Sequence, residues 1–365
     1  MALRGGAWLV AAVFFWCSYF FSHVAGWFGL LICRQQFLPF LRTNVVKLRN
    51  CQSIVFLIGL TTAVNLTRAD EMTADESRGF PNLPMKTAGG AQFWTDHCWQ
   101  DGYRLQKNAL TKHWRLLDPN NVRLAWGKRV QCEQKLVSLC PPQEATTAKH
   151  RVILLHGLMR TAGSMKSMAA SIEDASDSVA VPITYASSRA PIASHAAALR
   201  ELLEAFPEDD TFSFVAHSMG NIITRHLVAD LQRDGDPKGI LPRCQGMVML
   251  GPPNQGAIIA ERLGPTKVFA WVTGKGGMEL GKRWAELEPN LATPPFPFHI
   301  VAGEVHGPIE NPLIDGDGDF VVKVEETKLD GAASHTVVPV LHSFLMSDQA
   351  VIDQTIELLS NATAQ

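Results

Sequence analysis

Short apolar runs and amphipathic stretches alternate along the chain from about residue 149 onwards. The apolar runs are typical of strands buried on both faces, and the stretches with apolar residues three and four positions apart are typical of helices. Strands are expected at 152–155, 179–185, 212–216, 247–250, 299–301 and 336–341, and helices at 164–175, 192–206, 219–231 and 348–359. Because strands that alternate with helices form right-handed βαβ units, the pattern predicts an α/β domain whose mostly parallel sheet has helices on both faces.

The first 69 residues have a different pattern, with two apolar segments. No Asp, Glu, Lys or Arg lies between Arg4 and Arg34, and a membrane-spanning helix needs about 20 apolar residues. A second run, 54–64, follows several basic residues and precedes the small-x-small sequence 67–69, as in a secretory signal peptide. The segments predict either a transmembrane hairpin with a basic cytoplasmic loop, or a signal peptide behind an upstream extension if the true start is near residue 40. Both interpretations place the chain after about residue 70 outside the cytoplasm, anchored to the membrane or exported.

Residues 70–148 separate these segments from the α/β domain. A polar linker with Pro and Gly runs to about residue 95, and the stretch from Gln92 to Leu139 is rich in tryptophan. Its apolar residues recur at mixed three- and four-residue spacing, so we expect a helical extension with one face packed on the α/β domain. The expected organisation is a membrane or signal region at 1–69, a linker and Trp-rich helical extension at 70–148, and the α/β domain at 149–365.

Composition and charge exclude several classes of protein. The chain has 33 basic and 35 acidic side chains, whereas a protein that coats nucleic acid needs surplus positive charge, so we expect no nucleic-acid partner. There is no repeated block, Gly period or heptad run. Four cysteines follow residue 70, which allows two disulfides in an oxidising compartment or four unpaired thiols: Cys98, Cys132, Cys140 and Cys244.

The third expected strand of the α/β domain ends in Ala216-His217-Ser218-Met219-Gly220. A serine on a sharp turn from strand to helix is lifted above the sheet, and small residues two positions before and after it let the two backbones approach closely. The sequence has this G-x-S-x-G spacing, with alanine in the first position. Ser218 is therefore the candidate nucleophile.

The first expected strand of the same domain ends in His156-Gly157-Leu158. Gly157 permits the backbone to turn so that the amide of Leu158 faces a bound carbonyl group, while we expect His156 to be structural. The amide of Met219 would be the second donor, at the start of a helix whose dipole also favours negative charge. These two amides are the candidate oxyanion hole.

Together, the A-H-S-M-G turn and the His-Gly-Leu turn resemble the α/β-hydrolase superfamily, specifically bacterial lipases and esterases, over about residues 149–360. The resemblance implies an α/β-hydrolase fold and the chain order nucleophile, acid, histidine. His342 follows the last expected strand, at the sheet edge where this family has its base. His335 precedes that strand, so we expect it at the opposite edge.

An acid is expected between the nucleophile and the histidine. Aligning the acidic segment with the family's Asp-Gly-x-Val pattern selects Asp319. Phe320 stands where this pattern has glycine, which leaves Asp317 as the alternative. The acid would fix the tautomer of the histidine and stabilise its charged form.

The same acidic segment has a competing interpretation. Four acids have the spacing of a calcium-binding loop: Asp315, Asp317, Asp319 and Glu326. The sixth position of such a loop should be glycine and is Phe320, and no helix pair is expected on either side of it. We therefore expect neither a metal nor an organic cofactor.

These residues predict a serine hydrolase of carboxylic esters, a lipase or esterase, that works through an acyl-enzyme. For a domain next to a membrane, lipid esters are candidate substrates. Asn254, in the turn 251–256, and Arg160, beyond the oxyanion turn, are candidate substrate-binding residues. Two alternatives stay open: an acyltransferase that uses the same catalytic residues, and a non-catalytic binding module of the cell envelope.

Overall fold

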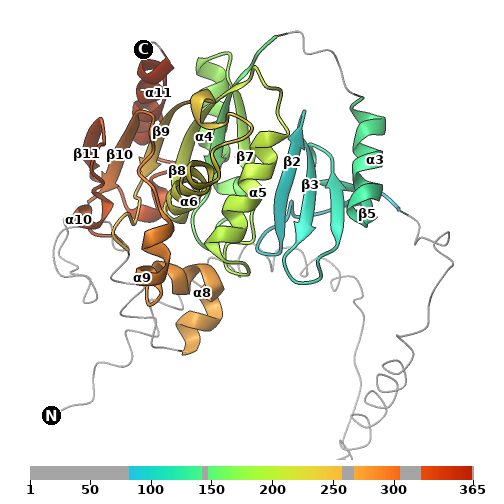
Figure 1. Ribbon diagram of the computed structural model, residues 1–365, viewed down its shortest axis with the longest axis horizontal. Helices are drawn as coiled ribbons and strands as arrows, with labels where there is room; N and C mark the ends of the chain where they lie inside the picture. The colour runs from blue at the N-terminus through green and yellow to red at the C-terminus, as the bar shows by residue number, and fades with distance from the viewer. Residues whose placement is uncertain (1–81, 142–146, 257–266, 305–321, 364–365) are drawn as a thin grey trace, which may run out of the picture. The chain divides into compact units, whose positions relative to one another are not determined.

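The computed structural model describes residues 82–141, 147–256, 267–304 and 322–363 (Figure 1). The apolar segments expected to anchor or export the chain lie outside these ranges, as do the three aspartates of the acidic segment. The described residues belong to one compact unit, Gly79–Gln365, and contain two sheets. Within these ranges no helix is both long enough and apolar enough to cross a bilayer.

The larger sheet has six parallel strands in the order β11-β10-β9-β8-β6-β7. They are β6 (His150–Leu155), β7 (Val179–Ile183), β8 (Thr211–His217), β9 (Cys244–Leu250), β10 (Phe298–Gly303) and β11 (Ser334–Val338). The α-helices of this part are α4 (Lys166–Ala175), α5 (Ile192–Glu204), α6 (Met219–Asp234), α8 (Lys267–Leu280), α9 (Trp284–Leu287), α10 (Val324–Thr327) and α11 (Gln349–Thr363). All strands and helices expected in this domain are confirmed, within a few residues at each end.

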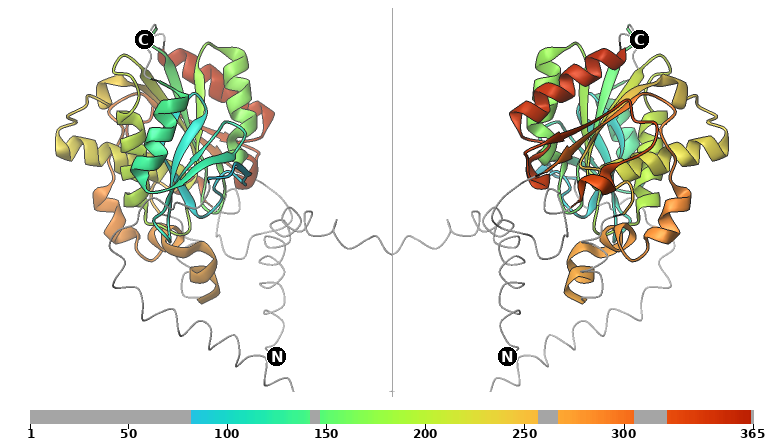
Figure 2. Two further views of the ribbon diagram at one scale, coloured as in Figure 1. Left: turned by 90° about the vertical axis from the view of Figure 1, so that its right-hand side faces the viewer. Right: turned by 90° about the vertical axis from the view of Figure 1, so that its left-hand side faces the viewer.

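Alternate residues along each strand face opposite layers of helices. In β6, Ile153 and Leu155 belong to the apolar cluster that contains α5 and α6, whereas Val152 and Leu154 belong to the cluster that contains α4 and α11. Figure 2 shows helices on both sides of the larger sheet. Because both faces are covered, the strands are almost continuously apolar, and this continuity made them recognisable in the sequence.

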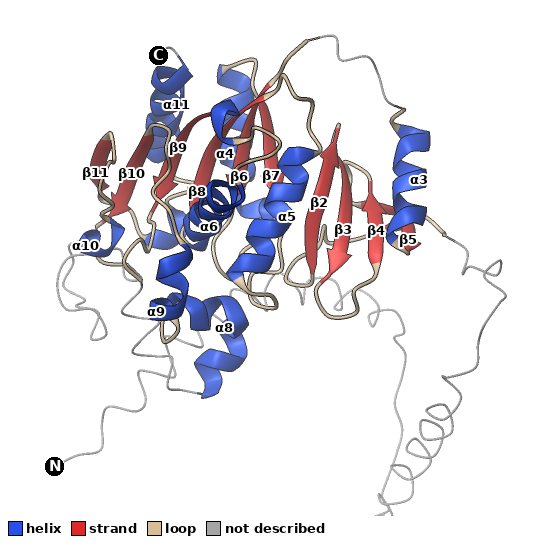
Figure 3. Cartoon of the chain, in the orientation of Figure 1, coloured by secondary structure: helices blue, strands red, loops and turns tan. Residues whose placement is uncertain are grey.

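The Trp-rich extension forms the second sheet, so the prediction of a helical extension is wrong (Figure 3). Its five antiparallel strands have the order β1-β5-β4-β3-β2, with bounds β1 (Met85–Lys86), β2 (Trp94–Gln100), β3 (Tyr103–Asn108), β4 (Trp114–Leu117) and β5 (Val122–Gly127). The helix of this extension is α3 (Arg129–Leu139). Its Cys132 and Leu136 pack with Leu105 and Leu116 on one face of the sheet.

Two features of the extension explain the wrong prediction. The register shifts between β2 and β3 and again between β4 and β5, and such irregularities break the two-residue alternation that marks a strand. The turn between β2 and β3 is Asp101-Gly102, with φ of 49° and 83°. An Asp-Gly pair at positive φ is typical of a two-residue hairpin, so this dipeptide was the sequence signal for a sheet.

The extension is attached to the larger sheet just beyond the end of β7. The backbone N–H of Asp96 in β2 donates to the carbonyl of Thr184 at 2.8 Å, and the N–H of Thr184 donates to the carboxylate of Asp96 at 2.6 Å. The N–H of Ala186 donates to the hydroxyl of Thr95 at 3.2 Å. Helix α5 also packs against β2. The extension is therefore an integral part of the fold rather than a separate appendage.

The cysteines at 98, 132, 140 and 244 are free thiols, which answers the question of disulfide pairing for the described residues. Cys132 and Cys244 are buried. Burial raises the pKa of Cys244 to about 12 and that of Cys132 to about 11, so both thiols stay protonated.

Candidate active site

Ser218 lies on a sharp turn between β8 and α6. Its backbone has φ 53° and ψ −120°, a conformation that costs a residue other than glycine about 1–3 kcal/mol. The N–H of Ser218 donates to the carbonyl of Leu250 at 2.9 Å, which ties the turn to the end of β9. The structure thus places Ser218 at the carboxyl ends of the parallel strands, on the kind of turn that the motif requires.

Two glycines provide the space that this turn needs. A Cβ atom at Gly220 would lie 2.7 Å from Cβ of Leu155 and 3.0 Å from its carbonyl oxygen. A Cβ atom at Gly157 would lie 2.7 Å from Nδ1 of His217 and 3.2 Å from Cβ of Ser218. The absence of a side chain at Gly220 lets α6 lie close to β6. The absence of a side chain at Gly157 lets the candidate oxyanion turn lie close to Ser218.

His342 is brought to the same turn by the chain after β11. It begins a short 3₁₀ helix, His342–Phe344, and only 5% of its surface is exposed. Its ring centroid is 4.7 Å from that of His217, the residue before the nucleophile. A Cβ atom at Gly251, which has φ 52°, would lie 2.9 Å from Nδ1 of His342. His342 therefore lies next to His217 and Gly251, at the edge of the sheet where Ser218 also stands.

His335 lies elsewhere. It is the second residue of β11, pairs with Ile300 of β10, and its Nε2 is 2.8 Å from the hydroxyl of Thr327. Since β11 is parallel to its neighbour, the start of this strand is at the opposite edge from Ser218. The position expected for His335 from the sequence is the one observed.

The side chain of His217 is hydrogen-bonded to the backbone of His342. Its Nε2 donates to the carbonyl of His342 at 2.9 Å. Burial and the neighbouring His342 hold the pKa of His217 well below its usual value, so the ring is neutral. Its Nδ1 is therefore unprotonated, and it is buried without a hydrogen-bond partner among the described residues. Sequence reasoning missed this supporting role, although His217 lay inside the motif.

The oxyanion loop, residues 156–160, follows β6. The carbonyl of Gly157 accepts hydrogen bonds from Nδ1 of His156 at 2.8 Å and from the N–H of Arg160 at 3.2 Å. Because the peptide bond is trans, the N–H of Leu158 points the opposite way, away from these donors. His156 is fully buried and stacks on Tyr185 at 3.9 Å. Burial lowers the pKa of His156 to about 3, so it acts as a neutral support, as expected.

Helix α8 covers the two candidate oxyanion residues. It has a kink at Gly274, where φ is 61°. A Cβ atom at Gly276 would lie 3.0 Å from Sδ of Met219 and 3.4 Å from Cδ1 of Leu158. Helix α8 therefore passes close to the side chains of the two residues whose amides would bind the oxyanion.

Both candidate substrate-binding residues make supporting contacts. Nη2 of Arg160 donates to the carbonyl of Ser343 at 3.1 Å, which joins the oxyanion loop to the residue after the candidate base. Oδ1 of Asn254 accepts from the guanidinium of Arg225 at 3.1 Å, and its Nδ2 donates to the carbonyl of Thr327 at 2.8 Å. Both ends of the buried Asn254 amide are thus used by other segments, which favours a structural role, and its assignment to the substrate stays a prediction.

The acid expected from the sequence falls outside the described residues. Asp315, Asp317 and Asp319 all fall there, so the choice of Asp319 over Asp317 stays a prediction. Glu326, the last acid of the calcium pattern, is buried and accepts the backbone N–H of Lys323 at 2.9 Å. In the part of the chain that the structure describes, no cluster of three His, Cys, Asp or Glu side chains could hold a metal ion.

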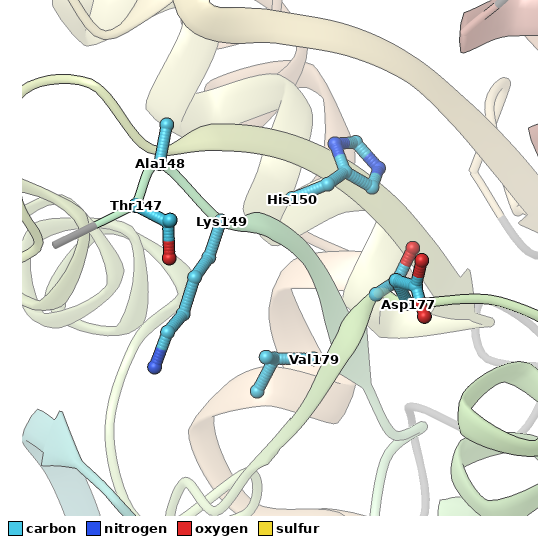
Figure 4. Close-up of a pocket in the computed structure, with 7 residues that line it drawn as sticks. Thr147, Ala148, Lys149, His150, Asp177 and Val179 are labelled. Carbon is cyan, nitrogen blue, oxygen red and sulfur yellow. The ribbon is translucent and has the colours of Figure 1, made fainter.

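A hollow elsewhere on the molecule is separate from this site (Figure 4). His150 and Val179, the first residues of β6 and β7, line it together with Lys149 and Asp177. It therefore lies at the amino ends of the parallel strands, whereas Ser218 lies at their carboxyl ends.

Residues 145–250 match the family described as "Putative serine esterase (DUF676)". The matched stretch contains β6, the oxyanion loop and Ser218, and it excludes the extension and His342. No curated protein matches the chain. The family match supports ester hydrolysis by a serine enzyme, and the six-stranded parallel sheet with helices on both faces fits the α/β-hydrolase fold.

Several solved structures are similar to the chain. The mature form of the lipase BlEst2 from Bacillus licheniformis is 16% identical, over 60% of this chain and 95% of that one, with a TM-score of 0.46. The metagenomic carboxyl esterase MGS0156 is 18% identical, over 61% and 76%, with a TM-score of 0.40. Phospholipase PlaB from Legionella pneumophila is 13% identical, over 59% and 62%, with a TM-score of 0.44.

Proposed function

We propose that the protein hydrolyses carboxylic esters and that Ser218 is its nucleophile. The observation that carries the proposal is the backbone of Ser218, which has φ 53° and ψ −120° at the junction of a parallel strand and a helix. The residue before it, His217, has its ring 4.7 Å from that of the buried His342. A strained residue of this kind persists only where the surrounding structure enforces it, and such residues cluster at functional sites. The match of residues 145–250 to the serine esterase family supports the same reaction.

In the proposed reaction, His342 takes the proton of the Ser218 hydroxyl as the oxygen attacks the acyl carbon. The electron pair of the carbonyl moves to its oxygen, and the amides of Leu158 and Met219 stabilise the negative charge. His342 then gives its proton to the leaving alcohol as the carbon–oxygen ester bond breaks, which leaves an acyl-enzyme. Water attacks the acyl carbon as it gives a proton to His342. His342 then returns this proton to the Ser218 oxygen as the bond from that oxygen to the acyl carbon breaks, which releases the carboxylic acid and free Ser218.

An acid would hold the ring of His342 in the tautomer that can accept the serine proton. We propose Asp319 for this role, with Asp317 as the alternative. Asp319→Asn should lower kcat by about 10⁴-fold if it is the acid, because the wrong tautomer is then favoured. Asp317→Asn should leave kcat within about a factor of three, and the reverse result would transfer the role to Asp317.

The test of the proposed function uses the full-length protein in detergent and p-nitrophenyl esters of increasing chain length. The wild type should turn over at least one of these esters and react with a fluorophosphonate probe. Ser218→Ala should lose both reactions, and His342→Ala should lose turnover, while His335→Ala serves as the matched histidine control and stays active. A folded wild type that neither cleaves an ester nor reacts with the probe would refute the proposal.

We also propose that this site works outside the cytoplasm, since both interpretations of the apolar segments before residue 70 place it there. Lipid esters would then be substrates within reach. Alkaline phosphatase, which is active only after export, can be fused after Leu139. An inactive fusion protein that accumulates in the cytoplasm would contradict this location.

A further inference from the structure

Gln92 is a buried polar residue of the extension that contacts the oxyanion loop of the larger sheet. It stands two residues before β2 and is 8% exposed. It lies outside the stretch that matches the serine esterase family. Its contacts come from residues 68 to 96 positions later in the chain, so nothing in the local sequence marked it.

Both ends of the Gln92 carboxamide make hydrogen bonds. Nε2 donates to the carbonyl of Arg160 at 2.7 Å. Oε1 accepts from the hydroxyl of Ser187 at 2.8 Å, and from the N–H and hydroxyl of Ser188 at 3.2 and 2.9 Å. A buried carboxamide whose donor and acceptor are both used is fixed in one orientation. Gln92 therefore joins two loops that follow neighbouring strands, β6 and β7.

Ser187 extends this restraint to the residue after Leu158. Its hydroxyl donates to Gln92 and also accepts the backbone N–H of Met159 at 2.9 Å. Met159 has φ 59°, a conformation that a side chain other than glycine adopts only when its surroundings enforce it. Through Ser187 and Arg160, Gln92 holds both residues that directly follow the candidate oxyanion donor.

The same loop also supports helix α8. The carbonyl of Ser188 accepts the N–H of Lys275 at 3.1 Å, directly after the kink at Gly274. One residue further on is Gly276, where a Cβ atom would lie within 3.4 Å of side-chain atoms of Met219 and Leu158. Loss of the Gln92 hydrogen bonds would therefore make the oxyanion loop more mobile. It would also weaken the support that Ser188 gives to helix α8.

We propose that Gln92 is a positioning residue for the oxyanion hole, and that through it the extension takes part in catalysis. The inference rests on the proposed ester hydrolysis. Amide donors stabilise a developing oxyanion only if they are fixed before the reaction, and a displacement of about 1 Å can lower the rate by about 100-fold. Gln92 supplies this rigidity to the amide of Leu158 without touching the substrate.

The main variant is Gln92→Met, which has a similar volume and removes all four hydrogen bonds. We expect kcat for a soluble ester to fall by about 10- to 100-fold, with KM within about a factor of two, because the oxyanion forms only in the transition state. Affinity for an alkyl boronic acid should fall by a similar factor. Its adduct with Ser218 is tetrahedral and places an oxygen where the oxyanion would be.

A second variant and a control separate positioning from folding. Gln92→Glu keeps the acceptor for Ser187 and Ser188 and loses the donor to Arg160, so it should retain more of kcat than Gln92→Met. Gln100→Met removes a glutamine at the other end of β2, where Nε2 donates to the carbonyl of Cys140 at 3.4 Å. This control should keep the kcat of the wild type.

All variants are studied as full-length protein, with the reactive sites counted by a fluorophosphonate probe and kcat expressed per reactive site. If Gln92→Met and Gln92→Glu lower only the melting temperature or the number of reactive sites, with kcat per site unchanged, the positioning role is refuted. An unchanged boronic acid affinity would refute it as well. A wild type that reacts with neither ester nor probe would overturn the proposed function itself, and this inference with it.

Discussion

Three histidines are buried behind the candidate site, and they stay uncharged in the fold: His156, His195 and His217. Burial lowers the pKa of His156 to about 3 and that of His195 to about 4, and it holds the pKa of His217 well below its usual value. An unfolded histidine has a pKa of about 6.5. The folded state therefore binds protons on these histidines more weakly than the unfolded state does. Relative to acidic pH, the fold is more stable above pH 6.5, where the histidines are neutral in both states. This stabilisation is lost as the pH falls from 6.5 towards the folded pKa values.

The size of this effect is large enough to measure. At pH 5.5 His156 and His195 each lower the free energy of unfolding by about 1 kcal/mol relative to neutral pH, and His217 acts in the same direction. The total stability of a domain is about 5–15 kcal/mol. His195 of α5 is the best residue to change, because it is 2% exposed and burial is the largest cause of its lowered pKa. We expect His195→Phe to reduce the loss between pH 7.5 and pH 5.5 by about 1 kcal/mol.

The assay is urea unfolding at pH 7.5, 6.5 and 5.5, followed by tryptophan fluorescence. His195→Gln is the matched variant: it also removes the titrating ring but packs differently against the ring of Tyr185, which lies 5.1 Å away. The two variants should differ in stability at pH 7.5 and share the same weaker dependence on pH. If the curves of stability against pH run parallel for the wild type and both variants, burial of His195 does not destabilise its charged form and the reasoning is refuted.

Two further predictions concern positive φ angles at the site. Ser218→Gly should raise the free energy of unfolding by about 1 kcal/mol relative to Ser218→Ala, because glycine adopts φ 53° without strain; equal urea midpoints for these two inactive variants would contradict a strained nucleophile. Gly251→Ala should lower kcat at least tenfold, because its Cβ atom would lie 2.9 Å from Nδ1 of His342. Gly239→Ala is its control, with φ 60° and no atom within 4 Å of the added Cβ, so it should lower stability and leave kcat unchanged.

The parts of the fold that could be predicted from the sequence are those where one physical requirement dominates. The strands of the larger sheet are covered on both faces, so their apolar runs are continuous and were recognised. Ser218, Gly220 and Gly157 were found because the turn tolerates so few residue types that it leaves a compact motif. His342 was selected by its position after the last strand, and in the structure its ring lies 4.7 Å from that of His217, the residue before Ser218, while its role as the base stays a prediction.

The extension could not be predicted in the same way, because its strands are short, twisted by register shifts and lined with polar residues. On one side of β3, Gln106 is fully buried and donates to the carboxylate of Asp96 at 2.7 Å, while its Oε1 accepts from Arg115 at 2.8 Å. A strand face buried with polar residues lacks the alternation of apolar and polar positions by which a strand is predicted from sequence. The role of Asn254 could not be settled from the sequence for a related reason: a polar residue in a turn near the site can bind a substrate or brace the backbone. Only the structure shows its contacts with Arg225 and Thr327.

The attachment of β2 beyond β7 has a practical consequence for work on this protein. Strand β7 is the last strand of the larger sheet on this side, and an uncovered edge strand pairs readily with strands of other molecules. A chain shortened to residues 149–365 would keep every proposed catalytic residue, but it would expose that edge and the surface of α5 that now packs against β2. Such a fragment should aggregate on purification. A soluble form suitable for crystallisation has to retain the extension from before β1.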